Sequence, residues 1–405
     1  MTTTDRWQLP DGVNELLPDK AWRVEKLRRQ IIDICYRWGY ELVMPPLIEY
    51  LESLMIGAGE TLDLQTFKII DQHNGRTLGV RADMTTQVAR MDAHALSDSS
   101  LNRLCYTGTV LRARSDGAGS SRTPLQFGAE LYGHPGPESD SEIIQLMLEN
   151  VCATGLKIND MLLDMGHVGV YRALINSARL HPELEAQIYD AMIRGSHPEI
   201  VSLLGAADCS ARHREELISL MTLSGHFESV LKNAYLHLGN AGAEVLNALE
   251  NLKTIVESVI RTHPKLLVHL DLAELRGYRY HTGTIFTLFE NSGVVIASGG
   301  RYDAIGEAFG HPRPATGFSG DLVNLERVCA RFESSIELHR QSGVIWVERC
   351  DDDELHKRIK ALRANGERVL VVLEDEEMSP DYRFDRKLVL HEGEWVIESL
   401  EHKQS

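Results

Sequence analysis

The amino-acid sequence predicts an α+β fold: an antiparallel sheet flanked by helices, with a helical insertion and a small C-terminal α/β unit. Three observations predict it. A long helical pattern leads into a strand near the N-terminus, and short apolar runs then follow one another at hairpin distance. From about residue 170 the apolar spacing becomes helical, and strand patterns return near residue 266. The 405 residues are enough for two or three domains of about 100 to 200 residues each.

The first predicted elements are a helix over residues 19–38 and a strand over 40–44. Apolar residues recur at helical spacing, with Asp19 as the N-cap and Gly39 after the last turn. The strand stops at Pro45-Pro46, since proline cannot donate to a sheet ladder. Three tryptophans of this part are interpreted as core residues: Trp7, Trp22 and Trp38.

The middle of the chain divides into sheet, insertion and sheet. From about 170 to 262 the helical pattern is broken by His-Pro and Gly, which predicts an all-helical insertion. Asn291-Ser292-Gly293 is typical of a hairpin turn. Strands are predicted over 77–81, 104–112, 125–132, 266–270, 284–289 and 294–297, and a helix over 141–154.

The C-terminal part predicts a separate small unit, which divides the chain into a core of residues 1–330 and a unit of residues 331–405. The acidic run Asp351-Asp352-Asp353 is interpreted as a helix cap. The predicted elements are a strand over 343–347, a helix over 353–364, a strand over 368–373 and a hairpin across His391-Glu392-Gly393.

Composition argues against several classes of function. The net charge of −17 repels a phosphate backbone and no basic run offsets it, so we expect no nucleic-acid partner. No apolar segment approaches the ~18 residues of a membrane span, and the start lacks a secretion signal, so we expect a cytoplasmic protein without membrane contact. The six cysteines form no CxxC pair, and Trp395 interrupts the HExxH pattern begun by His391-Glu392. We therefore expect buried free thiols and neither metal nor cofactor.

Four short segments place polar and charged side chains within apolar strands. They are Arg81–Thr85, Arg112, the pair Gln126 and Glu130, and Arg276–His281. Buried charges cost several kcal/mol unless they are paired. A zwitterionic ligand supplies partners, because carboxylates hold an amino group, arginines hold a carboxylate, and a glutamate or tyrosine fixes an imidazole tautomer. The alternative is that these residues pair only with one another.

The order and spacing of these segments resemble the catalytic domain of histidyl-tRNA synthetase, a class II aminoacyl-tRNA synthetase, over residues 10 to about 327. The segment Trp38–Pro46 is similar to the helix-strand-proline motif of the class II dimer interface. Arg81–Thr85 resembles the family's Arg-Pro-Glu-Gly-Thr, and Arg112–Glu130 its second motif. Arg276–His281 resembles the histidine-specific Arg-Gly-Leu-Asp-Tyr-Tyr, and Gly299–Asp303 the second histidine-specific signature. The resemblance implies a class II synthetase-like sheet.

The resemblance also implies a pocket for free histidine. Carried over residue by residue, Asp83, Thr85 and Gln126 would meet the amino group of the ligand. Arg112 and Arg276 would lie near its carboxylate. No residue of the pocket is assigned a catalytic role.

The imidazole side of the implied pocket combines one acid with aromatic rings. Its residues would be Glu130, Tyr280, His281 and Tyr302. Two positions depart from the family pattern, because Asp83 is a glutamate shortened by one methylene and His281 replaces a tyrosine.

At the positions where the synthetase family binds ATP, this chain departs from the family pattern. Where the second motif usually reads Phe-Arg-x-Glu, this chain has Leu111–Arg114, and Pro124 stands at the aromatic that stacks on adenine. Asp321 stands at a glycine of the third motif and Asn324 at its phosphate-facing arginine, while a shift to Arg327 restores one arginine only. Adenylate formation needs positioning and charge neutralisation together, so we expect none.

This combination resembles the histidyl-tRNA synthetase paralogues that serve as regulatory subunit of ATP phosphoribosyltransferase. The resemblance implies a partner, the short catalytic subunit that acts first in histidine biosynthesis, with L-histidine as effector and a homodimer within a hetero-oligomer. The final unit is short for the family's anticodon-binding domain, which agrees with this interpretation. Two alternatives stay open: an active histidyl-tRNA synthetase and a stand-alone histidine-sensing paralogue.

Overall fold

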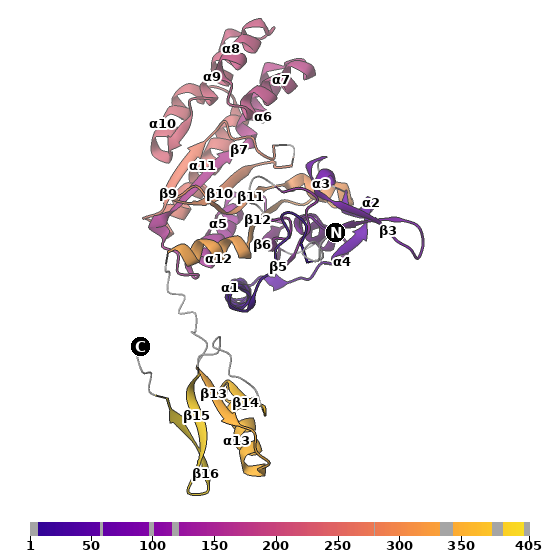
Figure 1. Ribbon diagram of the computed structural model, residues 1–405. Coiled ribbons are helices and arrows are strands. Elements are labelled where there is room, and N and C mark those ends of the chain that lie inside the picture. Colours follow the sequence, from indigo (N-terminus) through magenta and orange to yellow (C-terminus); the bar gives the residue numbers. More distant parts are fainter. Residues whose placement is uncertain are drawn as a thin grey trace. The chain divides into compact units, whose positions relative to one another are not determined.

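The protein forms two compact units, residues 1–334 and 335–405, each described by itself (Figure 1). The computed structural model describes residues 7–56, 60–96, 101–115, 121–278, 280–332, 343–374 and 384–400. Of residues 60 and 61 it describes the backbone but not the side chains.

The first unit is built on a nine-stranded sheet, counted over the described residues, of order β1-β5-β6-β12-β11-β10-β7-β9-β8. Neighbouring strands are antiparallel except that β1 pairs with β5, and β7 with β9, in parallel. The predicted antiparallel sheet is therefore confirmed for the central strands and wrong at these two pairs. The strands are β1 (Glu41–Leu42), β5 (Asn102–Thr109), β6 (Leu125–Tyr132), β7 (Met161–His167), β8 (Ser224–His226), β9 (Leu267–Asp271), β10 (Thr284–Glu290), β11 (Val295–Arg301) and β12 (Ala315–Asp321).

The long N-terminal helix α1 (Pro18–Arg37) packs against α5 (Pro137–Cys152) and α12 (Leu322–Arg331). It ends as predicted at Gly39, whose φ of 80° is a left-handed conformation that suits glycine. The predicted N-cap is wrong, because Leu17 holds that position and Asp19 lies in the first turn.

The prediction that the three tryptophans near this helix are core residues is wrong. Trp7 is 87% exposed and Trp22 is 59% exposed, while Trp38 donates its indole N–H to Glu149 at the surface. The buried face of the helix instead carries aliphatic side chains, including Leu27 and Ile31.

A small three-stranded sheet of order β2-β4-β3 precedes the helix that carries Thr85. The helix α4 contacts β6 and the short helix η3, so it covers the central sheet beside the cavity described below. These elements are β2 (Ile48–Tyr50), α2 (Leu51–Leu54), α3 (Glu60–Gln65), β3 (Phe67–Ile70), β4 (Thr77–Val80), α4 (Thr85–Ala95), η2 (Ile158–Asp160) and η3 (Asp303–Phe309).

The insertion is helical with one exception. The short strand β8 pairs antiparallel with β9 and extends the sheet edge, so the all-helical prediction is wrong there. Three residues including Gly225 carry too little apolar alternation to predict a strand. The helices, grouped together in Figure 1, are α6 (Val168–Ala178), α7 (Pro182–Ile193), α8 (His197–Ala206), α9 (Ala211–Leu220), α10 (Phe227–Leu238) and α11 (Ala243–Thr262).

The second unit is a four-stranded sheet, within its described residues, of order β14-β13-β15-β16. The side chain of Asp352 caps α13 by accepting from the N–H of Glu354, as predicted for this acidic run. Its elements are β13 (Val344–Glu348), α13 (Asp353–Ala364), β14 (Val369–Val372), β15 (Phe384–His391) and β16 (Glu394–Ser399).

The structure also bears on the predictions about thiols, metal ions and membrane spans. All six cysteines are free, but only Cys35, Cys105 and Cys329 are buried as predicted, whereas Cys152 and Cys209 are half-buried and Cys350 is exposed. Within the ranges described above, no group of acidic, His and Cys side chains is arranged to hold a metal ion. Of the helices in those ranges, none is long and apolar enough to cross a membrane.

Buried Arg301 ties the sheet to the start of α5. Its guanidinium bonds the Asp140 carboxylate at 3.1 Å and the Ser139 hydroxyl at 2.7 Å. It also donates to the carbonyl oxygens of His134 and Gly136. Since its side chain is almost fully buried, the buried carboxylate of Asp140 depends on it for charge compensation.

Replacing this arginine tests its structural role. Arg301→Met is expected to lower the free energy of unfolding of the first unit by ~3 to 5 kcal/mol, because it leaves Asp140 as an uncompensated buried charge. Urea unfolding followed by circular dichroism measures the change. The matched variant Arg327→Met, on the exposed side of α12, is expected to stay within ~0.5 kcal/mol of the wild type; equal losses would contradict the assignment.

Candidate functional site

A cavity of about 900 Å³ lies over the centre of the large sheet. Its lining comes from α3, the start of α4, the strands β6, β7, β10, β11 and β12, residues between Glu274 and His281, and Tyr189 of the helical insertion. Small-molecule sites usually measure about 300 to 1,000 Å³, so the cavity has the size of a ligand site.

Glu130 is the buried centre of this cavity. Its two carboxylate oxygens accept hydrogen bonds from Tyr106, at 2.8 Å, and from Tyr302. Burial raises the pKa of Glu130 to about 8, although the two tyrosine hydroxyls act in the opposite direction. A carboxyl group with such a pKa responds strongly to any cation that enters the cavity.

Glycine in the neighbouring strands makes room for this carboxylate. Gly317 is opposite Glu130 in the β12–β6 register, and a Cβ there would lie 1.6 Å from the Glu130 Oε2. A Cβ on Gly299 would lie 2.0 Å from the Gly317 carbonyl oxygen, and one on Gly300 would lie 2.8 Å from the His281 Nδ1. Gly299 and Gly300 both line the cavity.

A second carboxylate is held at the start of α4. Asp83 accepts from the N–H of Thr85 at 2.7 Å and from the amide of Gln126 at 2.8 Å. The carbonyl oxygen of that amide accepts from the N–H of Met84 at 3.0 Å. Asp83 and Thr85 line the cavity, whereas Gln126 lies behind them and orients Asp83.

The loop that carries Tyr280 and His281 is held against the cavity from outside by the insertion. Arg172 of α6 donates to the carbonyl oxygens of Tyr278, at 3.3 Å, and His281, at 3.0 Å. Gly277 turns the loop with a φ of 71°. The insertion therefore positions part of the cavity wall, a role that no sequence pattern indicated.

Two buried polar atoms of this loop lack a hydrogen-bond partner among the residues described. They are the hydroxyl oxygen of Tyr280 and the Nδ1 of His281. Burial lowers the pKa of His281 to about 4, so the imidazole is neutral at physiological pH. Tyr280 stacks on Tyr302 with ring centroids 5.2 Å apart, which orients both rings beside Glu130.

The outer part of the cavity carries one arginine and two acids. Arg276 pairs with Glu274 at 2.5 Å, and its side chain is 66% exposed. Asp164 contacts the Nδ1 of His269 at 2.7 Å. Asp164, Glu274 and Tyr189 line the cavity but were not singled out in the sequence, because no motif contains them.

Arg112 does not line the cavity but lies near Asp321. The cationic guanidinium lowers the pKa of Asp321, while burial, the larger effect, raises it. Asp321 also accepts from the N–H groups of Leu125, at 3.1 Å, and Val323, at 3.0 Å, and thereby caps α12. The carboxylate of Asp321 thus lies near Arg112, the arginine of the second motif.

The remaining altered positions of the nucleotide half are engaged with the chain itself. Asn324 donates to the carbonyl oxygen of Val295 at 2.7 Å and accepts from Arg327 at 2.6 Å. Pro124 is buried, and its carbonyl oxygen accepts from Val110. Arg327 is therefore directed to Asn324.

The structure brings most of the predicted site residues together around one cavity. Arg112 and Gln126 are the two that lie outside its lining. The predicted residues that line it are Asp83, Thr85, Glu130, Arg276, Tyr280, His281 and Tyr302.

Comparisons with known proteins agree with this geometry. A family model described as histidyl-tRNA synthetase matches residues 12–325, and one described as ATP phosphoribosyltransferase subunit HisZ C-terminal domain matches residues 342–398. The ATP phosphoribosyltransferase regulatory subunit of Thioalkalivibrio sulfidiphilus is 49% identical over 91% of this chain and 92% of its own length. That of Pseudomonas fluorescens is 45% identical over 99% of this chain and all of its own.

The chain belongs to the family of ATP phosphoribosyltransferase regulatory subunits. A crystal structure from Bacillus halodurans, described as an ATP phosphoribosyltransferase regulatory subunit/histidyl-tRNA synthetase, has a TM-score of 0.79 and 26% identity, covering 94% of this chain and 96% of that one. Histidyl-tRNA synthetase from Nostoc has a TM-score of 0.72 at 18% identity, covering 97% of both chains, and shares the fold. The predicted class II synthetase-like α+β fold is confirmed.

The fit between Gly317 and Glu130 can be tested by adding one methyl group. Gly317→Ala is expected to lower the free energy of unfolding by at least ~1 to 3 kcal/mol, because the new Cβ overlaps the buried carboxylate. Urea unfolding measures it. The same substitution at Gly205 in α8, where a Cβ meets nothing within 4 Å, is expected to be neutral or stabilising; destabilisation of both variants alike would refute the steric explanation.

The raised pKa of Glu130 predicts a pH dependence with a definite sign. Between the unfolded value of 4.5 and the folded value of about 8, the folded protein retains a proton that the unfolded chain has lost. The contribution of this group to stability is therefore greatest below 4.5, falls as pH rises to about 8, and is constant above. In Glu130→Gln this dependence is absent.

Calorimetric melting of wild type and Glu130→Gln across this range measures the difference. We expect the melting temperature of the wild type, relative to that of the variant, to fall steadily from about pH 5 to about pH 8. Glu244→Gln, at an exposed position of α11, serves as the control and should show a flat difference. A flat difference for Glu130→Gln as well would mean that the buried carboxyl keeps an ordinary pKa.

Proposed function

We propose that this chain is a non-catalytic regulatory subunit of ATP phosphoribosyltransferase that activates the short catalytic subunit and transmits feedback inhibition by L-histidine. It acts as a homodimer within a hetero-oligomer. The observation that carries the proposal is a contrast within one fold. Polar groups suited to an amino acid line the cavity, while Asp321 places an anion near Arg112 where the synthetase family has a glycine.

The cavity suits a zwitterionic amino acid with an imidazole ring. Asp83 offers a carboxylate to an amino group, and Arg276 offers a guanidinium to a carboxylate. Glu130, with the unpartnered atoms of Tyr280 and His281 nearby, supplies both acceptors and donors to an imidazole. Each of these atoms would gain a partner from such a ligand.

The nucleotide half gives no comparable support for catalysis. A triphosphate approaching Arg112 would meet the carboxylate of Asp321, and the two anions repel. Asn324 and Arg327 are bonded to each other and not directed to a shared anion site. Phosphoryl chemistry needs free cations at the transferring group, so a regulatory role is favoured over an active synthetase.

The relatives support the choice of partner. They are named regulatory subunits over essentially the whole length of this chain, C-terminal unit included. For histidine to regulate, it must bind two states of the assembly with different affinity, a coupling of typically ~1 to 3 kcal/mol.

Reconstitution with a short catalytic subunit tests this function. Phosphoribosyl-ATP formation is expected to rise when this chain is added and to fall again with added histidine. Glu130→Gln and Arg276→Ala are expected to raise the histidine concentration for half inhibition by about tenfold or more, since the first removes the buried carboxyl group proposed to face the imidazole and the second removes the guanidinium proposed to face the ligand carboxylate. Both variants should still activate the catalytic subunit.

Two controls separate this function from its alternatives. Lys253 lies on α11 outside the cavity lining. With Lys253→Ala, histidine should inhibit phosphoribosyl-ATP formation as it does with the wild type. Histidine-dependent exchange of pyrophosphate into ATP by this chain alone would identify an active synthetase instead. Histidine binding without any activation of a catalytic subunit would identify a stand-alone sensor, and unchanged inhibition in both cavity variants would move the effector site elsewhere.

A further inference from the structure

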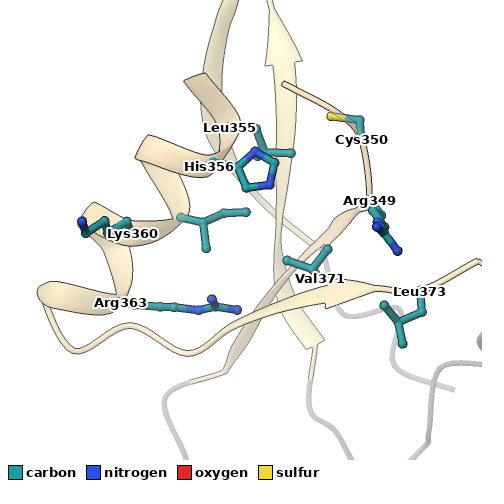
Figure 2. A pocket seen from close by; sticks show the side chains of 9 residues that line it. Arg349, Cys350, Leu355, His356, Lys360, Arg363, Val371 and Leu373 are labelled. Carbon is teal, nitrogen blue, oxygen red and sulfur yellow. The ribbon is translucent and has the colours of Figure 1, made fainter. Parts of the chain in front are cut away.

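The C-terminal unit contains a pocket of its own, with a volume of about 330 Å³ (Figure 2). It lies beyond the carboxyl ends of the parallel strands β13 and β14, where Arg349, Cys350 and Leu373 follow the last strand residues. Ligands of open α/β sheets commonly bind outside the carboxyl ends of parallel strands. The proposed histidine site is in the other unit and includes none of these residues.

The floor of this pocket is apolar. Leu355 and Ile359 face it from successive turns of α13, and Val371 faces it from β14. Leu355 and Ile359 are themselves buried members of the small core under the helix, so the floor is rigidly packed. An apolar floor of this kind suits a ring or a short hydrocarbon.

The rim of the pocket is cationic. Figure 2 shows Arg363 extending from α13 toward β14, with Arg349 on the opposite side and His356 above. Lys360 completes the rim at the outer face of α13. Within the described residues, no carboxylate forms an ion pair with Arg349, Lys360 or Arg363.

Two of the nearby carboxylates are engaged elsewhere, whereas Asp351, Asp353 and Glu374 are exposed and lie close to pocket residues in the sequence. Asp352 accepts from the indole N–H of Trp395 at 2.8 Å and caps α13. Glu354 pairs with Lys357 at 2.7 Å. Among the described residues the rim cations Arg349, Lys360 and Arg363 therefore have no ion-pair partner, although the chain carries a net charge of −17.

We propose that this pocket binds a small organic anion, with its apolar body on Leu355, Ile359 and Val371 and its anionic group between Arg349 and Arg363. Arg363 already donates to the carbonyl oxygen of Val369 at 2.8 Å, and each guanidinium has further N–H groups to donate to an anion. A volume near the lower end of the small-molecule range favours a compact ligand over a protein segment.

Cys350 provides a direct measurement of occupancy. It is exposed and lines the pocket, so a bound ligand should shield its thiol from iodoacetamide. The full-length chain is alkylated with increasing phenyl phosphate, and the rate at each cysteine is followed by peptide mass spectrometry. At ten times the dissociation constant, the Cys350 rate is expected to fall about tenfold, while Cys209 of the other unit keeps its rate.

Phenol and inorganic phosphate, the two components of phenyl phosphate, test the apolar floor and the cationic rim of the pocket separately. Phenol has the ring without the charge, and inorganic phosphate has the charge without the ring. Both are expected to protect Cys350 only at much higher concentration than phenyl phosphate. Equal protection by phenol, or no saturable protection by phenyl phosphate, would overturn the proposal.

Variants on one helix and one loop give matched controls. Arg349→Gln and Lys360→Gln are expected to raise the half-protecting concentration of phenyl phosphate, Arg349→Gln by about tenfold as for a lost charge-assisted bond. Arg358→Gln, also exposed on α13 but outside the lining, should leave it unchanged. An equal effect of Arg358→Gln would mean nonspecific attraction and reject the site. Tighter protection by an acidic peptide, acetyl-Glu-Leu-Glu-Leu-amide, would reject a small-molecule occupant.

Discussion

The buried carboxylate of Glu130 is the constraint on which the first unit depends. A carboxyl group in an apolar sheet is costly unless hydrogen bonds compensate it. Tyr106 and Tyr302 provide these bonds from strand β5 and from the end of β11. Its volume requires Gly317 opposite, and the close strand packing around Gly317 requires Gly299 in turn. One polar side chain on β6 thus constrains residue choice on three other strands, β5, β11 and β12.

The features that the sequence predicts are local, and those that it misses depend on contacts between distant segments. Helix ends at Gly39 and the cap at Asp352 follow from local backbone chemistry, and both are found where predicted. The position of Trp7 depends on what covers it, which no local pattern encodes, and the strand β8 exists only because β9 offers an edge to pair with. Motifs located Glu130 and Tyr302, yet Tyr106 lies outside any motif and emerges only from strand register. Long-range pairing is therefore the part that sequence reasoning misses.

Asp321 illustrates how one substitution changes both structure and chemistry. As the N-cap of α12 it satisfies backbone N–H groups of Leu125 and Val323. As an anion near Arg112 it supplies charge that an external phosphate would otherwise bring. The same carboxylate thus joins the start of β6 to the start of α12 and supplies negative charge near Arg112.

Contacts made by the helical insertion join the cavity wall to other helices of the first unit. Arg172 of α6 bonds the carbonyl oxygens of Tyr278 and His281, and Tyr189 of α7 contacts the ring of Tyr278 while lining the cavity. A ligand that reorders this loop must therefore also change contacts made by α6 and α7. Packed secondary elements that contact both a ligand site and the remainder of the fold can carry coupling between distant sites. These two helices meet that condition, since α6 also packs on α9 and α11, and α7 packs on α8.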